Sequence, residues 1–182
     1  MRIVAGSLGG RVLRAPPGAA TRPTSEKVRE ALFAILPDVT GAHVLDLFAG
    51  SGALGLEALS RGAAHATFVD SARPALAAVR HNLEALGVGD RATVLAGDAV
   101  ALARRHPPAA PWQIVFVDPP YASDLAERSV EAIPAAHLAQ DAVIVIEHDR
   151  RNAPPEVLGS LLRTDHRRYG DTLVSFYTAS SR

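Results

Sequence analysis

The tetrad Asp118-Pro119-Pro120-Tyr121 combines the residue types that can hold an amino group attached to an aromatic ring. It follows the apolar run 114–117, which predicts that it stands where a buried strand ends. Two consecutive prolines fix the turn and remove two N–H donors, so carbonyl oxygens are left to accept hydrogen bonds. The Asp118 carboxylate and the Pro119 carbonyl can then accept both N–H groups of an amine, while Tyr121 offers a ring for base stacking. The alternative is a rigid turn with a capping Asp and a core tyrosine.

A glycine-rich loop follows an earlier strand-like run. Gly50, Gly52 and Gly55 are spaced G-x-G-x-x-G, which allows a backbone to approach a nucleotide-type ligand closely. The spacing alone fits NAD, FAD or S-adenosylmethionine. Asp46, four positions before Gly50, would repel a pyrophosphate but suits a ligand with a cationic amino-acid end, so it favours S-adenosylmethionine.

Two further acids follow the next two strand-like runs. Asp70 ends the second run and can accept both ribose hydroxyls of a nucleoside. Asp98 follows the third run and can accept a hydrogen bond from an adenine amino group. Each can instead cap a helix, and Ser71 offers a second cap beside Asp70. The carboxyl ends of parallel strands form the crevice where open α/β sheets bind ligands, so we expect these acids to meet there. Glu147-His148 ends the fifth run near this edge and can contact substrate or serve the structure.

The elements that must position these residues alternate along the chain. Short apolar runs separated by helical segments predict a doubly wound parallel sheet with helices on both faces. The last two strand-like runs, 164–169 and 172–179, are joined by Gly170-Asp171 alone, so the final strand should be antiparallel. The predicted strands are 43–48, 66–69, 92–95, 113–117 and 142–147, and the predicted helices are 53–60, 73–86, 99–105, 125–132 and 155–162.

The N-terminal part has a different pattern. Runs 2–5 and 11–14 around a glycine-rich segment predict a β-hairpin, and a helix is expected from Thr24 or Ser25 to Leu36. We therefore expect an N-terminal hairpin-helix extension over 1–37 and a catalytic domain over 38–182. Residues 1–30 hold six basic side chains against Glu26 and Glu30, which suggests a local phosphate-binding patch on an otherwise acidic chain. The basic residues are Arg2, Arg11, Arg14, Arg22, Lys27 and Arg29.

Composition excludes several classes of protein. The chain has no cysteine, which rules out disulfides, thiolate zinc sites and the covalent route to C5-methylated cytosine. Its seven histidines show no metal-ligand spacing, so no metal is expected. No apolar run is long enough to span a membrane, and the first residues lack a signal-peptide core. We expect a cytoplasmic protein, acting as a monomer and without a membrane partner.

These motifs together resemble the RsmD family of class I methyltransferases. The similarity rests on the loop 46–55 and its continuation to Gly62, on Asp70 and Asp98, and on the tetrad 118–121. It also rests on the N-terminal run 2–6, on 22–24 with 28–30, and on the terminal run 169–172. The resemblance implies a Rossmann-like, seven-stranded sheet with an antiparallel last strand and an RNA-binding N-terminal extension. It implies the transfer of a methyl group from S-adenosylmethionine to N2 of a guanine in 16S ribosomal RNA, presented by an assembled or assembling 30S particle. Implied substrate contacts are Asp118, Pro119, Pro120 and Tyr121, and implied cofactor contacts are Asp46, Phe48, Ala49, Gly50, Ser51, Gly52, Asp70, Ser71, Asp98 and Ala99.

Three alternatives stay open from the residues themselves. The tetrad recognises an amine rather than a particular base, so adenine N6 in DNA or another RNA amine is the first. A nicotinamide-dependent oxidoreductase with the same glycine loop is the second, although it leaves the tetrad without a role. A non-catalytic factor that binds ribosomal RNA is the third.

Overall fold

The computed structural model describes residues 1–17, 26–105, 109–120 and 124–179. Within these residues, α1 is Glu26–Ile35, α2 is Ala53–Ser60, α3 is Arg73–Leu86, α4 is Ala99–Arg105 and α5 is Leu125–Ala132. The strands are β1 (His43–Leu47), β2 (His65–Asp70), β3 (Ala92–Ala96), β4 (Trp112–Val117), β5 (Leu138–His148), β6 (Val157–Leu158), β7 (Leu161–Tyr169) and β8 (Thr172–Ala179). Two short 3₁₀ turns, Gly89–Arg91 and Ala135–His137, precede β3 and β5.

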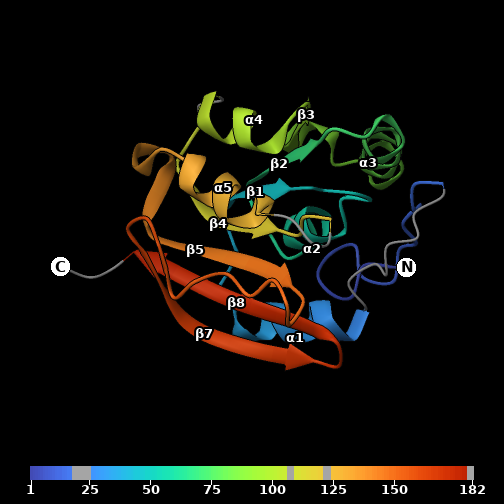
Figure 1. The fold of residues 1–182 in the computed structure, drawn as a ribbon. Coiled ribbons are helices and arrows are strands. Elements are labelled where there is room, and N and C mark those ends of the chain that lie inside the picture. Colours follow the sequence, from blue (N-terminus) through green and yellow to red (C-terminus); the bar gives the residue numbers. More distant parts are fainter. Residues whose placement is uncertain (18–25, 106–108, 121–123, 180–182) are drawn as a thin grey trace.

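The strands form one sheet in the order β3-β2-β1-β4-β5-β8-β7-β6 (Figure 1). The first five strands are parallel, and β8 pairs antiparallel with both β5 and β7. The order reverses direction between β1 and β4, which is the topological switch point where sheets of this type bind ligands. The doubly wound sheet and its antiparallel last strand are therefore confirmed.

Helices cover both faces of the sheet because alternate strand residues point to opposite sides. Val44 of β1 packs with α1, α2 and α3 in one core, whereas the next residue, Leu45, packs with α4 and α5 in the other. Both residues are almost completely buried. Figure 1 shows α4 and α5 on the side of the sheet opposite α1 and α2. This double cover explains why the parallel strands read as continuous apolar runs.

The helix predicted over 155–162 is wrong. This segment instead forms β6 and the start of β7, joined by the turn at Gly159-Ser160. Gly159 has a left-handed backbone with φ of 58°, which interrupts a helix but suits a two-residue hairpin turn. Leu158 and Leu161 face each other across this turn and are both buried. The apolar pair Leu158 and Leu161 is therefore a cross-strand contact.

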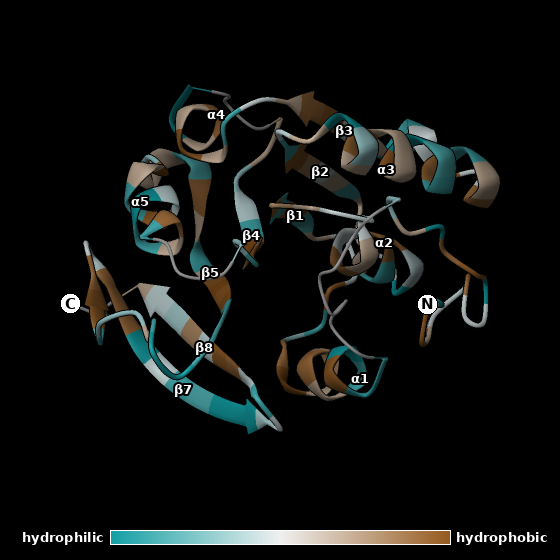
Figure 2. Cartoon of the chain, turned by 45° about the vertical axis from the view of Figure 1, so that its right-hand side comes forward, coloured by the Kyte–Doolittle hydropathy of each residue, from teal (hydrophilic) through white to brown (hydrophobic). Residues whose placement is uncertain are grey.

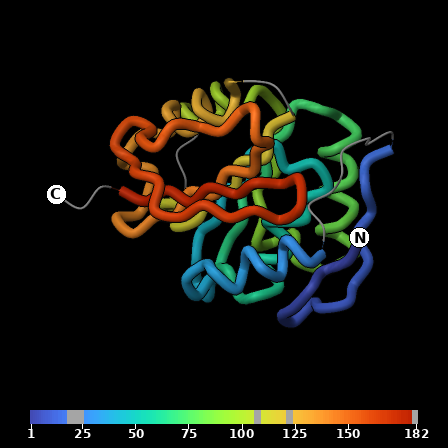
Figure 3. Tube along the Cα trace, turned by 60° about the horizontal axis from the view of Figure 1, so that its bottom comes forward, coloured from blue at the N-terminus to red at the C-terminus, as the bar shows by residue number. Residues whose placement is uncertain are grey.

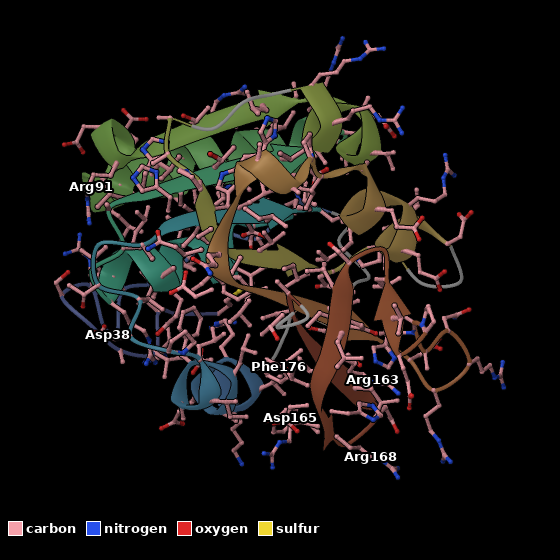
Figure 4. All side chains as sticks on the ribbon, turned by 90° about the vertical axis from the view of Figure 1, so that its left-hand side faces the viewer. Asp38, Arg91, Arg163, Asp165, Arg168 and Phe176 are labelled. Carbon is pink, nitrogen blue, oxygen red and sulfur yellow. The ribbon has the colours of Figure 1, made fainter. Side chains whose placement is uncertain are left out.

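The C-terminal hairpin follows its prediction. Tyr169 pairs with Thr172 across the two-residue turn Gly170-Asp171, and Gly170 has the positive φ that such a turn requires. The described sheet has eight strands rather than seven because the two-residue β6 adds an edge beyond β7. Much of β7 is hydrophilic (Figure 2), and Arg163, Asp165 and Arg168 belong to this strand (Figure 4).

The N-terminal segment folds back on itself beside α2 and α3 (Figure 3). Its hairpin has a single β-bridge, between Arg2 and Val12, so it is looser than the predicted pair of strands. Ile3 and Leu13 are buried in the same core as α1 and α2. The division into an extension over 1–37 and a domain over 38–182 stays a prediction, because both parts share one core.

Candidate functional site

A cleft of about 570 Å³ opens at the carboxyl ends of the parallel strands. This volume is in the range typical of sites for small molecules and cofactors. Its walls come from the loops after β1, β2, β3 and β4, together with the N-terminal segment. The acids that line it are Asp46, Asp70, Asp98 and Asp118, and no Lys, Arg or His is among its described lining residues.

The loop after β1 forms the floor of this cleft. Phe48 has a left-handed backbone with φ of 63°, a strained conformation for a residue with a side chain. Gly50 and Gly52 also have positive φ, at 56° and 78°, and Gly52 is the N-cap residue of α2. The Ala49 N–H donates to the Val69 carbonyl at 2.9 Å, which ties the loop to β2. Strain concentrated in a loop that lines a cleft is typical of binding sites.

Gly55 allows α2 to pack closely against the sheet. A Cβ atom at this position would collide with the ring of Phe68 on β2, so only glycine fits. The Gly55 N–H donates to Asp46 Oδ2 at 3.0 Å. Asp46 is only 2% exposed, and burial raises its pKa to about 7; the Gly55 hydrogen bond opposes this effect and the negative charge of Asp70 adds to it. Asp46 is thus a buried carboxyl that titrates near neutral pH.

The acids after β2 and β3 each hold a loop as well as lining the cleft. Asp70 Oδ2 accepts the Gly50 N–H at 2.9 Å, and its other oxygen accepts the Ala72 N–H at 2.8 Å. Asp98 Oδ1 accepts the Ala101 N–H at 2.8 Å, at the start of α4. Asp98 therefore caps α4, as the helix-capping alternative predicts. Because both acids still line the cleft, capping does not exclude a contact with a ligand.

Asp118, Pro119 and Pro120 lie at the end of β4, next to the glycine loop in the sheet order. The Asp118 side chain is partly buried. Burial, followed by the negative charges of Glu147 and Asp46, raises the pKa of Asp118 well above the ordinary value of an aspartate. Strongly shifted carboxyls in a cleft are frequent at functional sites. Tyr121, the last residue of the tetrad, lies outside the described residues.

Most residues implicated by the sequence meet in this one cleft. The described lining includes Asp46, Phe48, Ala49, Gly50, Ser51, Asp70, Ser71, Asp98, Ala99, Asp118, Pro119 and Pro120. Gly52 does not line the cleft, and a Cβ atom there would come within 3.2 Å of the Phe68 ring. The structure thus gives Gly52 a role in packing α2, and its contact with a cofactor stays a prediction.

Sequence reasoning missed one wall of the cleft. Met1 and the segment 15–17, which reads as a linker, also line the cleft. Asn82 of α3 fixes this wall: its side chain accepts the Arg14 N–H at 2.8 Å and donates to the Arg14 and Ser51 carbonyls, each at 3.0 Å. A buried polar residue on the apolar face of a helix was the available signal.

The basic residues of the N-terminal part divide into exposed and buried ones. Arg2, Arg11, Arg14 and Lys27 are exposed, whereas Arg22 lies outside the described residues. Arg29 is completely buried, and its guanidinium donates to the Arg2 carbonyl at 2.6 Å. The prediction that Arg29 contacts RNA is therefore contradicted, because its charged group holds the hairpin onto α1 inside the protein.

Two absences hold for the described part of the chain. No group of three His, Asp or Glu side chains there is arranged to hold a metal ion. No helix there is long and apolar enough to cross a membrane.

Comparison with known structures identifies the fold. The ribosomal protein L11 methylase of Lactobacillus delbrueckii, at 16% identity, superimposes with a TM-score of 0.73 over 94% of this chain and 86% of its own, so the two proteins share a fold. Residues 1–178 match the family described as Conserved hypothetical protein 95, and the chain belongs to this family, the RsmD family.

Individual relatives are similar to this chain over most of their length. The Escherichia coli K12 protein named Ribosomal RNA small subunit methyltransferase D is 40% identical over 159 residues, which cover 86% of this chain and 79% of that protein. YlbH of Bacillus subtilis is 41% identical over 97% of this chain and 98% of its own. The structure of YhhF from Escherichia coli matches with a TM-score of 0.84 and 35% identity, over 100% of this chain and 99% of that one.

Proposed function

We propose that this protein transfers a methyl group from S-adenosylmethionine to the exocyclic N2 amine of a guanine in small-subunit (16S) ribosomal RNA. The observation that carries the proposal is the cleft itself, where four carboxyls and the Asp118-Pro119-Pro120 turn meet. The relatives named as methyltransferases of small-subunit ribosomal RNA support the choice of substrate.

The cleft suits a cationic nucleoside ligand. Its described lining offers carboxylates and loop N–H groups but no cationic side chain, so it would repel the pyrophosphate of a dinucleotide. This argues against the alternative of a nicotinamide-dependent oxidoreductase. We assign the amino-acid end of the cofactor to Asp46 and the glycine loop, the ribose to Asp70 and the adenine to Asp98. When bound, S-adenosylmethionine supplies an activated methyl group.

The protein contributes position and desolvation to the reaction. The Asp118 carboxyl and the Pro119 carbonyl accept the two N–H groups of the target amine. These two hydrogen bonds direct the lone pair of the amine nitrogen away from the base and toward the cleft. Asp118 need not act as a strong base, because the amine loses its proton readily once it carries the methyl group. To reach this site the base must leave its stack or be presented in a loop.

RNA binding is assigned to the N-terminal surface. Arg2, Arg11, Arg14 and Lys27 expose their charged groups there, and phosphate contacts of this kind supply affinity without base specificity. The substrate we propose is the RNA within an assembled or assembling 30S particle. The protein would act there as a monomer in the cytoplasm.

Substitution of Asp118 tests the holding of the target amine separately from the binding of the cofactor. Asp118→Ala removes one amine acceptor but leaves the glycine loop, so turnover should fall by roughly 10²- to 10³-fold. The affinity for S-adenosylhomocysteine, measured by calorimetry, should change by less than about threefold. Asp90→Ala, at an exposed acid away from the cleft, is the control. Near-normal turnover of Asp118→Ala would remove the amine-holding role.

A further inference from the structure

Glu147 stands beside Asp118 at the same edge of the sheet. Val117 of β4 is in register with Ile146 of β5, so Asp118 and Glu147 are the next residues on two adjacent parallel strands. Strands of one sheet are about 4.8 Å apart, which sets the spacing of the two backbones. Phe116 and Val145, two residues earlier on each strand, both belong to the core on the α1 and α2 side. By the alternation of strand side chains, Asp118 and Glu147 point to that side too.

A small recess connects the two carboxyls. It is lined by Asp118 and Glu147 together with apolar side chains of α1, α2 and β8, and Asp118 also lines the large cleft. The recess has a volume of about 10 Å³, room for about one water molecule. The recess is therefore too small for a whole base ring. The apolar lining consists of Val28, Leu32, Leu54, Phe116, Val117, Val145 and Val174.

The bases that carry an exocyclic amine differ at the ring nitrogen beside that amine. In guanine the amine lies between N1, which carries a hydrogen and donates, and N3, which is an acceptor. In adenine N1 is an acceptor, and in cytosine N3 is an acceptor. A carboxylate on the N1 side of the amine-binding site therefore forms a hydrogen bond with guanine only, and it faces a lone pair in the other two bases. A buried acceptor left facing another acceptor loses its hydrogen bond and pays for its desolvation.

We propose that Glu147 makes the site specific for guanine: its carboxylate accepts the N1–H while Asp118 and Pro119 hold the adjacent N2 amine. This inference rests on the proposed function and adds to it the residue that distinguishes guanine from adenine. The negative charge of Glu147 acts on Asp118, which agrees with their proximity. The three donors on this edge of guanine then match three acceptors of the protein.

The test compares guanine with 2-aminopurine, which keeps the 2-amino group but has an acceptor at N1. The two bases are placed at the methylated position of small-subunit RNA, after that position has been mapped from the product. Wild-type protein should prefer guanine. Glu147→Gln should reduce this preference by roughly 10- to 100-fold, because the glutamine amide carries no charge to favour the N1–H of guanine and its NH₂ group can donate to N1 of 2-aminopurine. Glu131→Gln, at an exposed acid of α5, should keep the wild-type preference.

The outcomes separate the inference from the function on which it rests. Glu147 does not line the cofactor cleft, so Glu147→Gln should bind S-adenosylhomocysteine as the wild type does, which verifies its fold. An unchanged preference in a folded Glu147→Gln variant would overturn the role of Glu147. Equal rates of the wild type on the two bases would overturn it as well, without any variant. Methyl transfer by the wild type to adenine but not to guanine would instead overturn the proposed function.

Discussion

The buried environment of Asp46 lowers the stability of the folded protein when its carboxyl is charged. It is buried, it accepts a hydrogen bond from Gly55, and its pKa is raised to about 7 mainly by burial. In the unfolded chain an aspartate titrates near pH 3.9. Between these two values the folded state holds the extra proton, so the stability falls as pH rises from about 4 to 7. Above pH 7 the full cost of a buried charge is present, and a cationic ligand would offset it.

Asp46→Asn should therefore stabilise the free protein at pH 8 and leave it unchanged at pH 4. The amide oxygen of asparagine can still accept the Gly55 N–H, and no charge has to be buried. We expect Tm at pH 8 to rise by roughly 2–6 °C, corresponding to about 1–2 kcal/mol in a chain of this size. Thermal unfolding followed over pH 4–8 measures this, and binding of S-adenosylhomocysteine should weaken at the same time. A Tm difference that is largest at pH 4 would show that the sign is wrong.

At the residue scale, the sequence predicts the location of the cleft acids better than it predicts the contacts of Arg29. Asp46 lies near the end of a strand-like run, and Asp70, Asp98 and Asp118 come within three residues after one, so local spacing is enough to place them at one edge. The burial of Arg29 depends instead on how the hairpin packs against α1. The sequence periodicity of α1 alone cannot predict that contact.

At the scale of elements, α2 joins the N-terminal segment to the cofactor loop. Its one acid, Glu57, is completely buried and accepts the Val4 N–H at 2.7 Å and the Ala5 N–H at 3.0 Å. The Arg61 side chain donates to the same carboxylate at 2.8 Å. The two oxygens of Glu57 thus satisfy three donors, which fixes the hairpin against the helix that starts at the cleft.

Glu57→Gln should loosen this junction. The amide has only one acceptor oxygen, and its NH₂ group would face a backbone N–H, so we expect a loss of about 1–3 kcal/mol. Hydrogen exchange at the amides of Val4 and Ala5 should become faster, while exchange in β4 should change only with global stability. Glu84→Gln, at an exposed position on α3, is the matched control. Unchanged protection of both amides would contradict the anchoring role of Glu57.

The elements most accurately predicted are those with a strong local pattern. Helices α2, α3, α4 and α5 match their predicted bounds, because each lies between two apolar strands. The segment 155–162 failed because four apolar residues can lie on a helical face or pair across a hairpin. There the left-handed turn at Gly159 decides in favour of the hairpin.

At the scale of the whole molecule, the cofactor cleft and the proposed RNA-binding surface share residues 1–17. Met1, Ala15, Pro16 and Pro17 line the cleft, while Arg11 and Arg14 in the same segment face the solvent. A wall formed by a segment far away in the sequence cannot be inferred from motifs on the sheet. Only the packing through Asn82 and Glu57 reveals that the N-terminal part completes the site.

The most direct test of the central claim is methyl transfer from labelled S-adenosylmethionine with nucleoside analysis of the products. The substrates are small ribosomal subunits that lack the modification, naked small-subunit RNA and duplex DNA. We predict N2-methylguanosine from the RNA substrates, most of it from the subunits, and no label in DNA. Label found only as N6-methyladenine in DNA, or no label in any substrate, would contradict the claim.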